Sequence, residues 1–264
     1  MTDCKHAFAV CAYGKSPYIA ECLESLFAQK GQDSDIFIST STPSGYLVEM
    51  ARRFGVPLYV NEGESGIGQD WNSAYVRAKA PFVTIAHQDD VYCPEYAAAA
   101  VAALERDPAS LIYFCDYGEI RNGERIDDNR LLRVKRMLLR PLSGGRGAST
   151  TRAKRKALRF GSSICCPSVT FNVVNCPRPP FIVGMKSNLD WATWEVLSKR
   201  RGSFLYDDAI HMYHRVHAGS ATTELIASHE RDEEDLAMLE KFWPHPVARV
   251  IERVYTLGTK SNSL

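Results

Sequence analysis

The first half of the chain alternates short apolar runs with longer stretches whose apolar residues recur at helical spacing. For example, Ser16 is expected to be an N-cap followed by Pro17 at the first helical position, and Ile19, Cys22, Leu23 and Leu26 share one face of this helix. Short strands that alternate with helices predict a mostly parallel sheet with helices on both faces. The expected strands cover residues 8–13, 36–39, 57–60, 82–86 and 111–115, and the remaining expected helices cover 47–54, a segment opening after Gly66-Ile-Gly68, and 94–106.

The second half is less regular. It predicts a strand over 168–174, a helix carrying Asp190, two strands over 203–206 and 210–216, and a charged amphipathic helix from Ser228. A chain of 264 residues can bury one substantial core. We therefore expect a single α/β domain over 1–225, with a central, mostly parallel mixed sheet flanked by helices, and a C-terminal helical extension over 226–264.

Two adjacent carboxylates follow the apolar run that begins at Phe82. Asp89 and Asp90 lie at the carboxyl end of this expected strand, where open α/β sheets bind ligands. Like charges at such a place repel each other unless a cation or a fixed set of donors lies beside them. The pair therefore indicates a divalent metal that holds an anionic, phosphorylated ligand; an Asp-rich turn capping the next helix is the structural alternative.

Composition narrows the class of protein. The net charge of +1 gives no indication of a nucleic-acid partner, and no apolar run approaches the roughly 18 residues that span a bilayer. The eight cysteines lack zinc-type spacing, which is typical of reduced thiols. With no signal-peptide pattern after Met1, we expect a cytoplasmic protein.

One local stretch departs from this neutrality. Between Arg130 and Arg159 there are eleven Lys or Arg residues and no acidic one, with Gly144, Gly145 and Gly147 among them. Such a density predicts a stretch that is mobile in isolation. A solvated surface is the structural interpretation; the functional ones are closure over a diphosphate, capture of an anionic acceptor, or peripheral contact with an anionic membrane. Nucleic-acid binding is not expected, because aromatic residues are not interleaved with the basic ones.

Five short motifs follow one another along the chain. They are Ala12-Tyr13 with the helix from Tyr18 to Leu26; Asn61 with Gly66-Ile-Gly68 and Asn72; Ile85-Ala-His-Gln-Asp-Asp90; Leu189-Asp190-Trp191; and Tyr213-His-Arg-Val-His-Ala-Gly-Ser220. Each is weak alone, but their order and separations resemble the inverting family 2 nucleotide-sugar glycosyltransferases of the GT-A fold, over roughly Ala7 to Thr223. The resemblance implies a nucleotide-sugar-binding half over 1–118 and an acceptor-binding half over 119–225.

The resemblance implies a donor site at the carboxyl ends of the first strands. Tyr13 would stack on a nucleobase, although a plain strand-end aromatic is the alternative. A helix opening after Gly66 would present backbone N–H groups to a diphosphate, although glycine there can also serve only a tight turn. The expected donor is a nucleoside diphosphate sugar, first of all a UDP-sugar, bound by Ala12, Tyr13, Ser39, Gly66, Asp70, His87 and Asp89.

A metal and a general base are also implied. Asp89, Asp90 and His217 would hold Mn²⁺ or Mg²⁺, and Asp190 would deprotonate the acceptor; as an acid at a helix start, Asp190 can also be merely structural. The implied enzyme is of hexosyltransferase type. It would transfer a sugar, with inversion, to a hydroxyl of a glycan or lipid-linked acceptor in cell-surface polysaccharide synthesis.

Three positions depart from the family pattern. His87 replaces the usual first aspartate, Leu189 replaces the glutamate before the expected base, and Ser39-Thr-Ser-Thr42 replaces an acidic strand end. These departures leave two alternatives to a working transferase. One is a sugar-nucleotide-binding protein without catalysis, and the other is a nucleotidyltransferase on a related fold.

Overall fold

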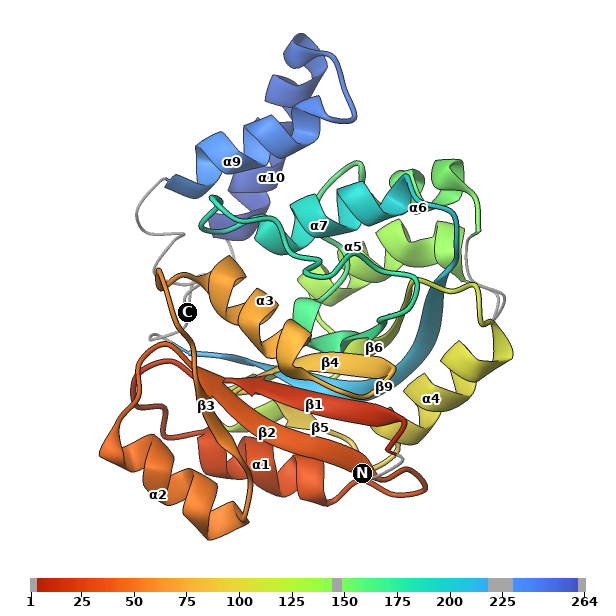
Figure 1. The fold of residues 1–264 in the computed structure, drawn as a ribbon. Helices are drawn as coiled ribbons and strands as arrows, with labels where there is room; N and C mark the ends of the chain where they lie inside the picture. The colour runs from red at the N-terminus through yellow and green to blue at the C-terminus, as the bar shows by residue number, and fades with distance from the viewer. Residues whose placement is uncertain (1–3, 144–148, 218–229, 261–264) are drawn as a thin grey trace.

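The computed structural model describes residues 4–143, 149–217 and 230–260, which form an α/β domain around one mixed sheet (Figure 1). Within these residues the strand order is β3-β2-β1-β4-β8-β6-β9-β5, and β7 pairs with β6. Helices cover both faces of the sheet. The expected architecture is therefore confirmed.

The first half is a parallel sheet with helical crossovers. β1 lies at its centre because it pairs in parallel with both β2 and β4. Its side chains alternate between two cores: Phe8 and Val10 pack with α1, α2 and α4, whereas Ala7 and Ala9 pack on the side of α3. The elements are β1 (His6–Cys11), α1 (Ile19–Phe27), β2 (Ser34–Thr40), α2 (Gly45–Phe54), β3 (Leu58–Val60), α3 (Ile67–Arg77), β4 (Phe82–His87), β5 (Val91–Tyr92) and α4 (Tyr96–Arg106).

The start of α1 differs from the expectation. Ser16 does not cap the helix, since its Oγ accepts a hydrogen bond from the N–H of Tyr18 and the helix begins only at Ile19. Pro17 therefore lies in a turn before the helix rather than in its first position.

The second half adds antiparallel pairing. β8 (Val169–Asn172) lies between β4 and β6 (Ile112–Arg121) and is antiparallel to both, while β9 (Phe204–Val216) runs parallel to β6. The prediction of two separate strands over 203–206 and 210–216 was wrong. The strand continues through Asp208 and Ala209 because two register shifts against β6 accommodate the extra residues. β7 (Glu124–Ile126) was not predicted, and α7 (Leu189–Ser198) carries Asp190 as expected.

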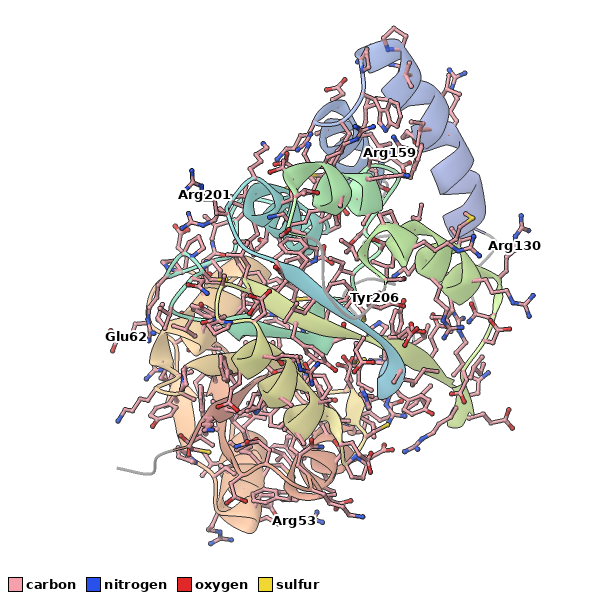
Figure 2. The ribbon with its side chains drawn as sticks, turned by 90° about the vertical axis from the view of Figure 1, so that its right-hand side faces the viewer. Arg53, Glu62, Arg130, Arg159, Arg201 and Tyr206 are labelled. Atoms are coloured by element: carbon pink, nitrogen blue, oxygen red, sulfur yellow. The ribbon has the colours of Figure 1, made fainter. Side chains whose placement is uncertain are left out.

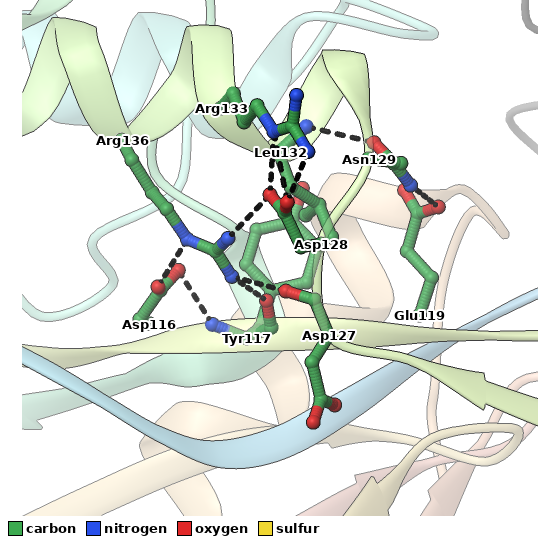
Figure 3. Close-up of polar contacts among 9 residues, drawn as sticks. All are labelled: Asp116, Tyr117, Glu119, Asp127, Asp128, Asn129, Leu132, Arg133 and Arg136. Atoms are coloured by element: carbon green, nitrogen blue, oxygen red, sulfur yellow. Dashed lines mark hydrogen bonds and ion pairs between the residues drawn. The ribbon is translucent and has the colours of Figure 1, made fainter.

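Helices occupy most of the basic stretch. The side chain of Asn129 caps α5 (Arg130–Leu139), and that of Thr150 caps α6 (Thr151–Leu158). The short η1 (Arg140–Leu142) follows α5, and the expected mobile glycines lie outside the described residues. Figure 3 shows how the charges on α5 are matched: Arg136 pairs with Asp116 at 2.5 Å, and Arg133 pairs with Asp128 at 2.5 Å.

The C-terminal segment forms two helices rather than the single one expected, α9 (Glu230–Glu240) and α10 (His245–Lys260). They stack on the layer that contains α7 (Figure 1), and their Met238, Leu239 and Ala248 belong to the same hydrophobic core as α3 and α7. The expected boundary at 225/226 lies outside the described residues. None of the described helices is both long and apolar enough to cross a bilayer.

Glu234 joins α9 to the start of α7. Its carboxylate accepts hydrogen bonds from the backbone N–H groups of Lys186, Ser187 and Asn188, at 2.7, 2.8 and 3.0 Å. Partial burial raises the pKa of Glu234, but these bonds and that of the Ser187 hydroxyl outweigh it, so the pKa is lowered. The negatively charged Glu234 carboxylate is therefore fixed at the start of α7, where backbone N–H groups lack a partner within the helix.

We predict that Glu234→Ala lowers the free energy of unfolding by about 1–2 kcal/mol, since the helix start loses its acceptor. Because the folded pKa is lowered, this contribution is present above the unfolded pKa of 4.5 and is lost as the pH falls below it. Denaturant unfolding of both proteins at several pH values measures the difference. Glu233→Ala, at an exposed position on the same helix, is the control and should leave stability almost unchanged; equal losses would contradict the role of Glu234.

Candidate functional site

The carboxyl ends of β1, β2 and β4 lie at one edge of the sheet. Cys11 is paired in register with Ser39 of β2 and with His87 of β4, so the three chains leave the sheet at the same level. Ala12, just beyond β1, is buried. The expected residues at the three strand ends are thus brought together at one edge of the sheet, where open α/β sheets bind their ligands; we call this edge the crevice.

Tyr13 lies on the lip of this crevice. Its ring is 65% exposed, which is unusual for a large aromatic side chain. Its backbone, however, is held: Tyr13 N–H donates to Gln88 Oε1 at 3.3 Å, and Gln88 Nε2 donates to the Tyr13 carbonyl at 2.9 Å. The backbone of Tyr13 is thus fixed beyond the end of β1, while its side chain lies outside the core.

A chain of polar side chains continues from the lip. Ser39 Oγ donates to Asn61 Oδ1 at 2.7 Å, and Asn61 Nδ2 donates to Asp70 Oδ1 at 2.9 Å. The other oxygen of Asp70 accepts from Ser41 Oγ at 2.7 Å. Ser39 and Asp70, both expected at the site, are thereby joined through Asn61. Sequence reasoning placed Asn61 in a motif but did not assign it to the site.

The two glycines at the start of α3 have different surroundings. Gly66 is the N-cap, and a Cβ atom there would meet only the end of the flexible Gln69 side chain, at 2.4 Å from Oε1. A Cβ atom on Gly68 would lie 2.9 Å from the carbonyl oxygen of Ile182. Close backbone packing therefore explains Gly68, while the start of the helix remains open at Gly66.

The two adjacent aspartates after β4 have different roles in the structure. Asp90 is fully buried, and its Oδ1 accepts from the Arg215 N–H and from His214 Nδ1, both at 2.9 Å. Burial raises the pKa of Asp90, but the charge and hydrogen bond of His214 help to outweigh it and lower the pKa. Asp90 Oδ2 is buried without a hydrogen-bond partner, with His87 Nδ1 at 3.8 Å. Asp90 thus anchors β9 to the end of β4.

Asp89 faces the crevice together with His217. Asp89 Oδ2 lies 2.9 Å from His217 Nε2, and both side chains are about one-fifth exposed, at 17% and 22%. The His217 ring packs on Tyr18, with centroids 5.0 Å apart. The structure therefore brings together these two expected metal ligands. An oxygen and an imidazole nitrogen are ligand types that suit Mn²⁺.

Arg215 connects Asp89 to α1. Its Nε donates to the Asp89 carbonyl at 2.9 Å, and its Nη2 lies 2.5 Å from Glu21 on α1. The guanidinium stacks on the ring of Tyr18 at 4.3 Å. Arg215 and Glu21 were not predicted as site residues. Both lie within the family-like motifs of the sequence, and the alternation on β9 puts Arg215 and His217 on one face.

His87 is the last residue of β4 and lies beside Cys11 of β1 at this edge of the sheet. Its ring stacks on Trp71, with centroids 4.9 Å apart and planes at 22°. Burial lowers the pKa of His87, so the imidazole is neutral at pH 7, and its Nε2 is buried without a partner. The residue therefore adds no charge where the family pattern has an aspartate.

Asp190 approaches the same site from α7. Its Oδ1 accepts from the Trp191 N–H at 2.6 Å, and its Oδ2 accepts from Ser162 Oγ at 3.1 Å. Leu189 beside it is buried and faces the Gly68 position of α3, where a glutamate would have to be buried as well.

Within residues 4–143, 149–217 and 230–260, no group of three or more His, Cys, Asp or Glu side chains is arranged to hold a metal ion. Asp89 and His217 could supply two ligands, and further ligand atoms could come from Asp90, a bound molecule or water. Ala218, Gly219 and Ser220, the end of the last motif, lie outside the described residues.

Comparisons with known proteins give a family and a fold. The model of the family described as "Glycosyl transferase family 2" matches residues 8–167. A search of curated proteins finds no match. Among solved structures, S. aureus TarS 1-349 in complex with UDP-GlcNAc is 18% identical with a TM-score of 0.60, covering 94% of this chain and 70% of that one.

Two further structures are similar. The mannosyltransferase PcManGT from Pyrobaculum calidifontis, in complex with GDP-Man and Mn²⁺, is 15% identical with a TM-score of 0.60, covering 96% of this chain and 69% of that one. Glucosyl-3-phosphoglycerate synthase from Mycobacterium tuberculosis, with Mn²⁺, UDP and glucosyl-3-phosphoglycerate, is 13% identical with a TM-score of 0.61, covering 89% and 80%. At such identities these likenesses establish a shared fold, which confirms the expected GT-A architecture.

The contrast between the two aspartates can be tested by stability alone. We predict that Asp90→Ala lowers the free energy of unfolding by about 2–4 kcal/mol, because the Arg215 N–H and His214 lose a buried acceptor. Asp89→Ala, which removes a partly exposed contact with His217, should cost less than about 1 kcal/mol. Denaturant unfolding in EDTA measures both variants. Losses of equal size would contradict the anchoring role of Asp90.

Proposed function

This chain belongs to glycosyl transferase family 2, and we propose that it is a metal-dependent, inverting member of it. In this proposal the enzyme moves a sugar from a nucleoside diphosphate sugar to a hydroxyl of a glycan or lipid-linked acceptor, in cell-surface polysaccharide synthesis. One observation carries the proposal: Asp89 and His217 meet at the carboxyl end of β4, and Leu189 packs beside Gly68, so that the start of α7, with Asp190, lies at the start of α3.

The donor would lie between Tyr13 and the Asp89–His217 pair. The exposed ring of Tyr13 can stack on a nucleobase. The network of Ser39, Asn61 and Asp70 supplies hydroxyl and carboxylate groups at the lip for the base edge or ribose. A uridine donor is the first candidate, and the solved relatives with UDP-GlcNAc, UDP or GDP-Man support a nucleotide-sugar donor.

The N-terminal end of α3, with Gly66 as its N-cap, would face the diphosphate. Asp89 and His217 would hold the Mn²⁺ or Mg²⁺. When bound, the ion would supply positive charge that stabilises the departing diphosphate. Direct coordination by Asp90 stays a prediction; its buried negative charge favours a cation nearby in either case. The Mn²⁺ in two solved relatives supports this assignment.

Asp190 would act as the general base. The Ser162 hydroxyl and the Trp191 N–H both donate to its carboxylate and fix its orientation. As the acceptor oxygen bonds to the anomeric carbon, Asp190 would take the hydroxyl proton. The bond to the diphosphate breaks on the opposite side and its electron pair leaves with the diphosphate, so the anomeric configuration inverts. One carboxylate suffices, because no covalent intermediate is formed.

A sugar-nucleotide-binding protein without catalysis is the second candidate. The neutral His87 at an aspartate position favours it, since a negative charge near the metal is lost there. The same crevice, however, retains Asp89, His217 and Asp190. A nucleotidyltransferase would release pyrophosphate instead, so product analysis distinguishes all three.

We predict that release of a nucleoside diphosphate from the correct donor requires a divalent metal. A screen of UDP- and GDP-sugars, with and without EDTA, should give turnover that EDTA abolishes and Mn²⁺ or Mg²⁺ restores. Turnover that is unchanged in EDTA would contradict the assigned metal. Donor binding without release would favour the binding protein, and release of pyrophosphate would favour the nucleotidyltransferase.

We also predict that Asp190→Asn reduces turnover by roughly a hundredfold or more while donor affinity stays nearly constant, because the amide keeps the shape but cannot accept the proton. The measurement is kcat with saturating donor, alongside donor Kd. Asp33→Asn, the same change at an exposed site before β2 and at the opposite edge of the sheet, is the control. A near-normal rate for Asp190→Asn would leave this residue as a helix start only.

A further inference from the structure

A cationic pocket lies between α6 and the turn that joins α9 to α10. Its volume is about 460 Å³, and none of the described residues that line it carries a carboxylate. Figure 2 shows Arg159, one of its residues, beside the C-terminal helices. We call it the α6 pocket; it is lined by Arg152, Arg155, Lys156, Arg159, Phe242 and Trp243.

Helical spacing explains the concentration of charge. Residues 152, 155, 156 and 159 are three or four apart, so their side chains share one face of the helix and repel one another. Among the described residues, Arg155 pairs with Glu195 of α7, but no carboxylate forms an ion pair with Arg152, Lys156 or Arg159. The pocket therefore carries an excess of positive charge that a bound anion would reduce.

A second cavity provides the contrast. Beside α5 a cavity of about 670 Å³ is lined by Arg133, Arg136 and Arg140, but Asp116, Asp127, Asp128 and Asp208 line it as well. The ion pairs of Figure 3 neutralise Arg133 and Arg136 from within this cavity. The α6 pocket has no such acidic lining among the described residues.

Aromatic rings hold the guanidinium groups of the α6 pocket in place. Arg155 lies over Phe242 at 4.5 Å, and Arg159 lies over Phe160 at 4.8 Å and over Trp243 at 5.3 Å. Trp243 is itself fixed, because its indole Nε1 donates to the Arg159 carbonyl at 2.7 Å. Stacked guanidinium groups lose less freedom when they bind an anion.

Arg159 of the α6 pocket has a hydrogen-bond donor without an acceptor. Its Nε is buried and has no hydrogen-bond partner. A buried donor without an acceptor is costly, and a ligand oxygen reaching it would recover that cost. Guanidinium groups match the geometry of phosphate oxygens and can bind them in pairs.

We propose that the α6 pocket binds phosphate groups of an anionic ligand, at a site separate from the donor crevice. The volume exceeds that of a single phosphate, so a phosphorylated sugar, a phosphodiester chain or a phospholipid headgroup all present the required chemistry. Arg152, Lys156 and Arg159 supply the attraction, and Arg155 remains paired with Glu195 to hold α6 on α7.

Two binding measurements test the proposal, and neither depends on transferase activity. Calorimetric titration with pyrophosphate in EDTA, which suppresses metal-assisted binding in the donor crevice, measures a soluble phosphate ligand. Cosedimentation with vesicles containing phosphatidic acid measures a headgroup. In at least one of the two, Arg152→Gln/Lys156→Gln/Arg159→Gln should weaken binding by about tenfold or more. Arg159→Lys keeps the positive charge but loses the planar guanidinium group, so it should weaken binding less than the triple variant does.

The control Arg52→Gln/Lys79→Gln/Arg201→Gln removes three exposed cations from other parts of the surface. It should leave binding almost unchanged, and thermal melts verify that every variant is folded. Binding to pyrophosphate but not to vesicles assigns the site to a soluble phosphorylated ligand, and the reverse assigns it to a headgroup. Equal weakening by both triple variants, or no binding of either probe to the wild type, would overturn the proposal.

Discussion

The buried carboxylate of Asp90 is the contact on which the crevice depends. The residue follows β4, in the parallel half of the sheet, yet it accepts its hydrogen bonds from His214 and Arg215 near the end of β9. These segments are separated by more than a hundred residues in the sequence, so this carboxylate, together with the pairing of β5 with β9, closes a long loop. Closing it brings His217 beside Asp89 and lets Arg215 reach the Asp89 carbonyl.

The start of α7, which carries Asp190, is also held in place by carboxylates. Glu234 and Asp235 of α9 bind the backbone and the side chain around Asn188, just before Asp190. The C-terminal helices therefore help to fix the position of the proposed base, although they lie outside the match to the family model. Both the end of β9 and the start of α7 thus rely on acidic side chains whose hydrogen-bond partners lie far away in the sequence.

The sequence was sufficient to predict the parallel half of the fold, because its periodicities are local. Phe8 and Val10, or Ile19 and Leu23, reveal their element from neighbours a few residues away. The strand ends, and with them Tyr13, Ser39 and Asp89, could be placed at one edge for the same reason. The family resemblance added His217 and Asp190, which no local pattern links to that edge.

What could not be predicted depends on contacts between distant residues. The anchoring of β9 by Asp90, the continuous strand through Asp208 and the matching of Arg136 with Asp116 are all tertiary. The adjacent Asp89 and Asp90 looked equivalent in sequence, and only burial separates them. Likewise the basic stretch looked uniform, although Asp116 and Asp128 from outside it pair with Arg136 and Arg133 of α5, whereas no described carboxylate pairs with Arg152 or Lys156 of α6.

The two hydrogen bonds between Tyr13 and Gln88 affect the entropy change of ligand binding. Two hydrogen bonds immobilise the Tyr13 backbone before any ligand arrives, so only two side-chain torsions remain to be ordered when the ring meets a partner. The entropic cost of forming that contact is thus largely met during folding. In the proposed donor site, a flat ring with this little freedom would accept different planar partners at similar entropic cost and would leave discrimination between them to the nearby polar groups.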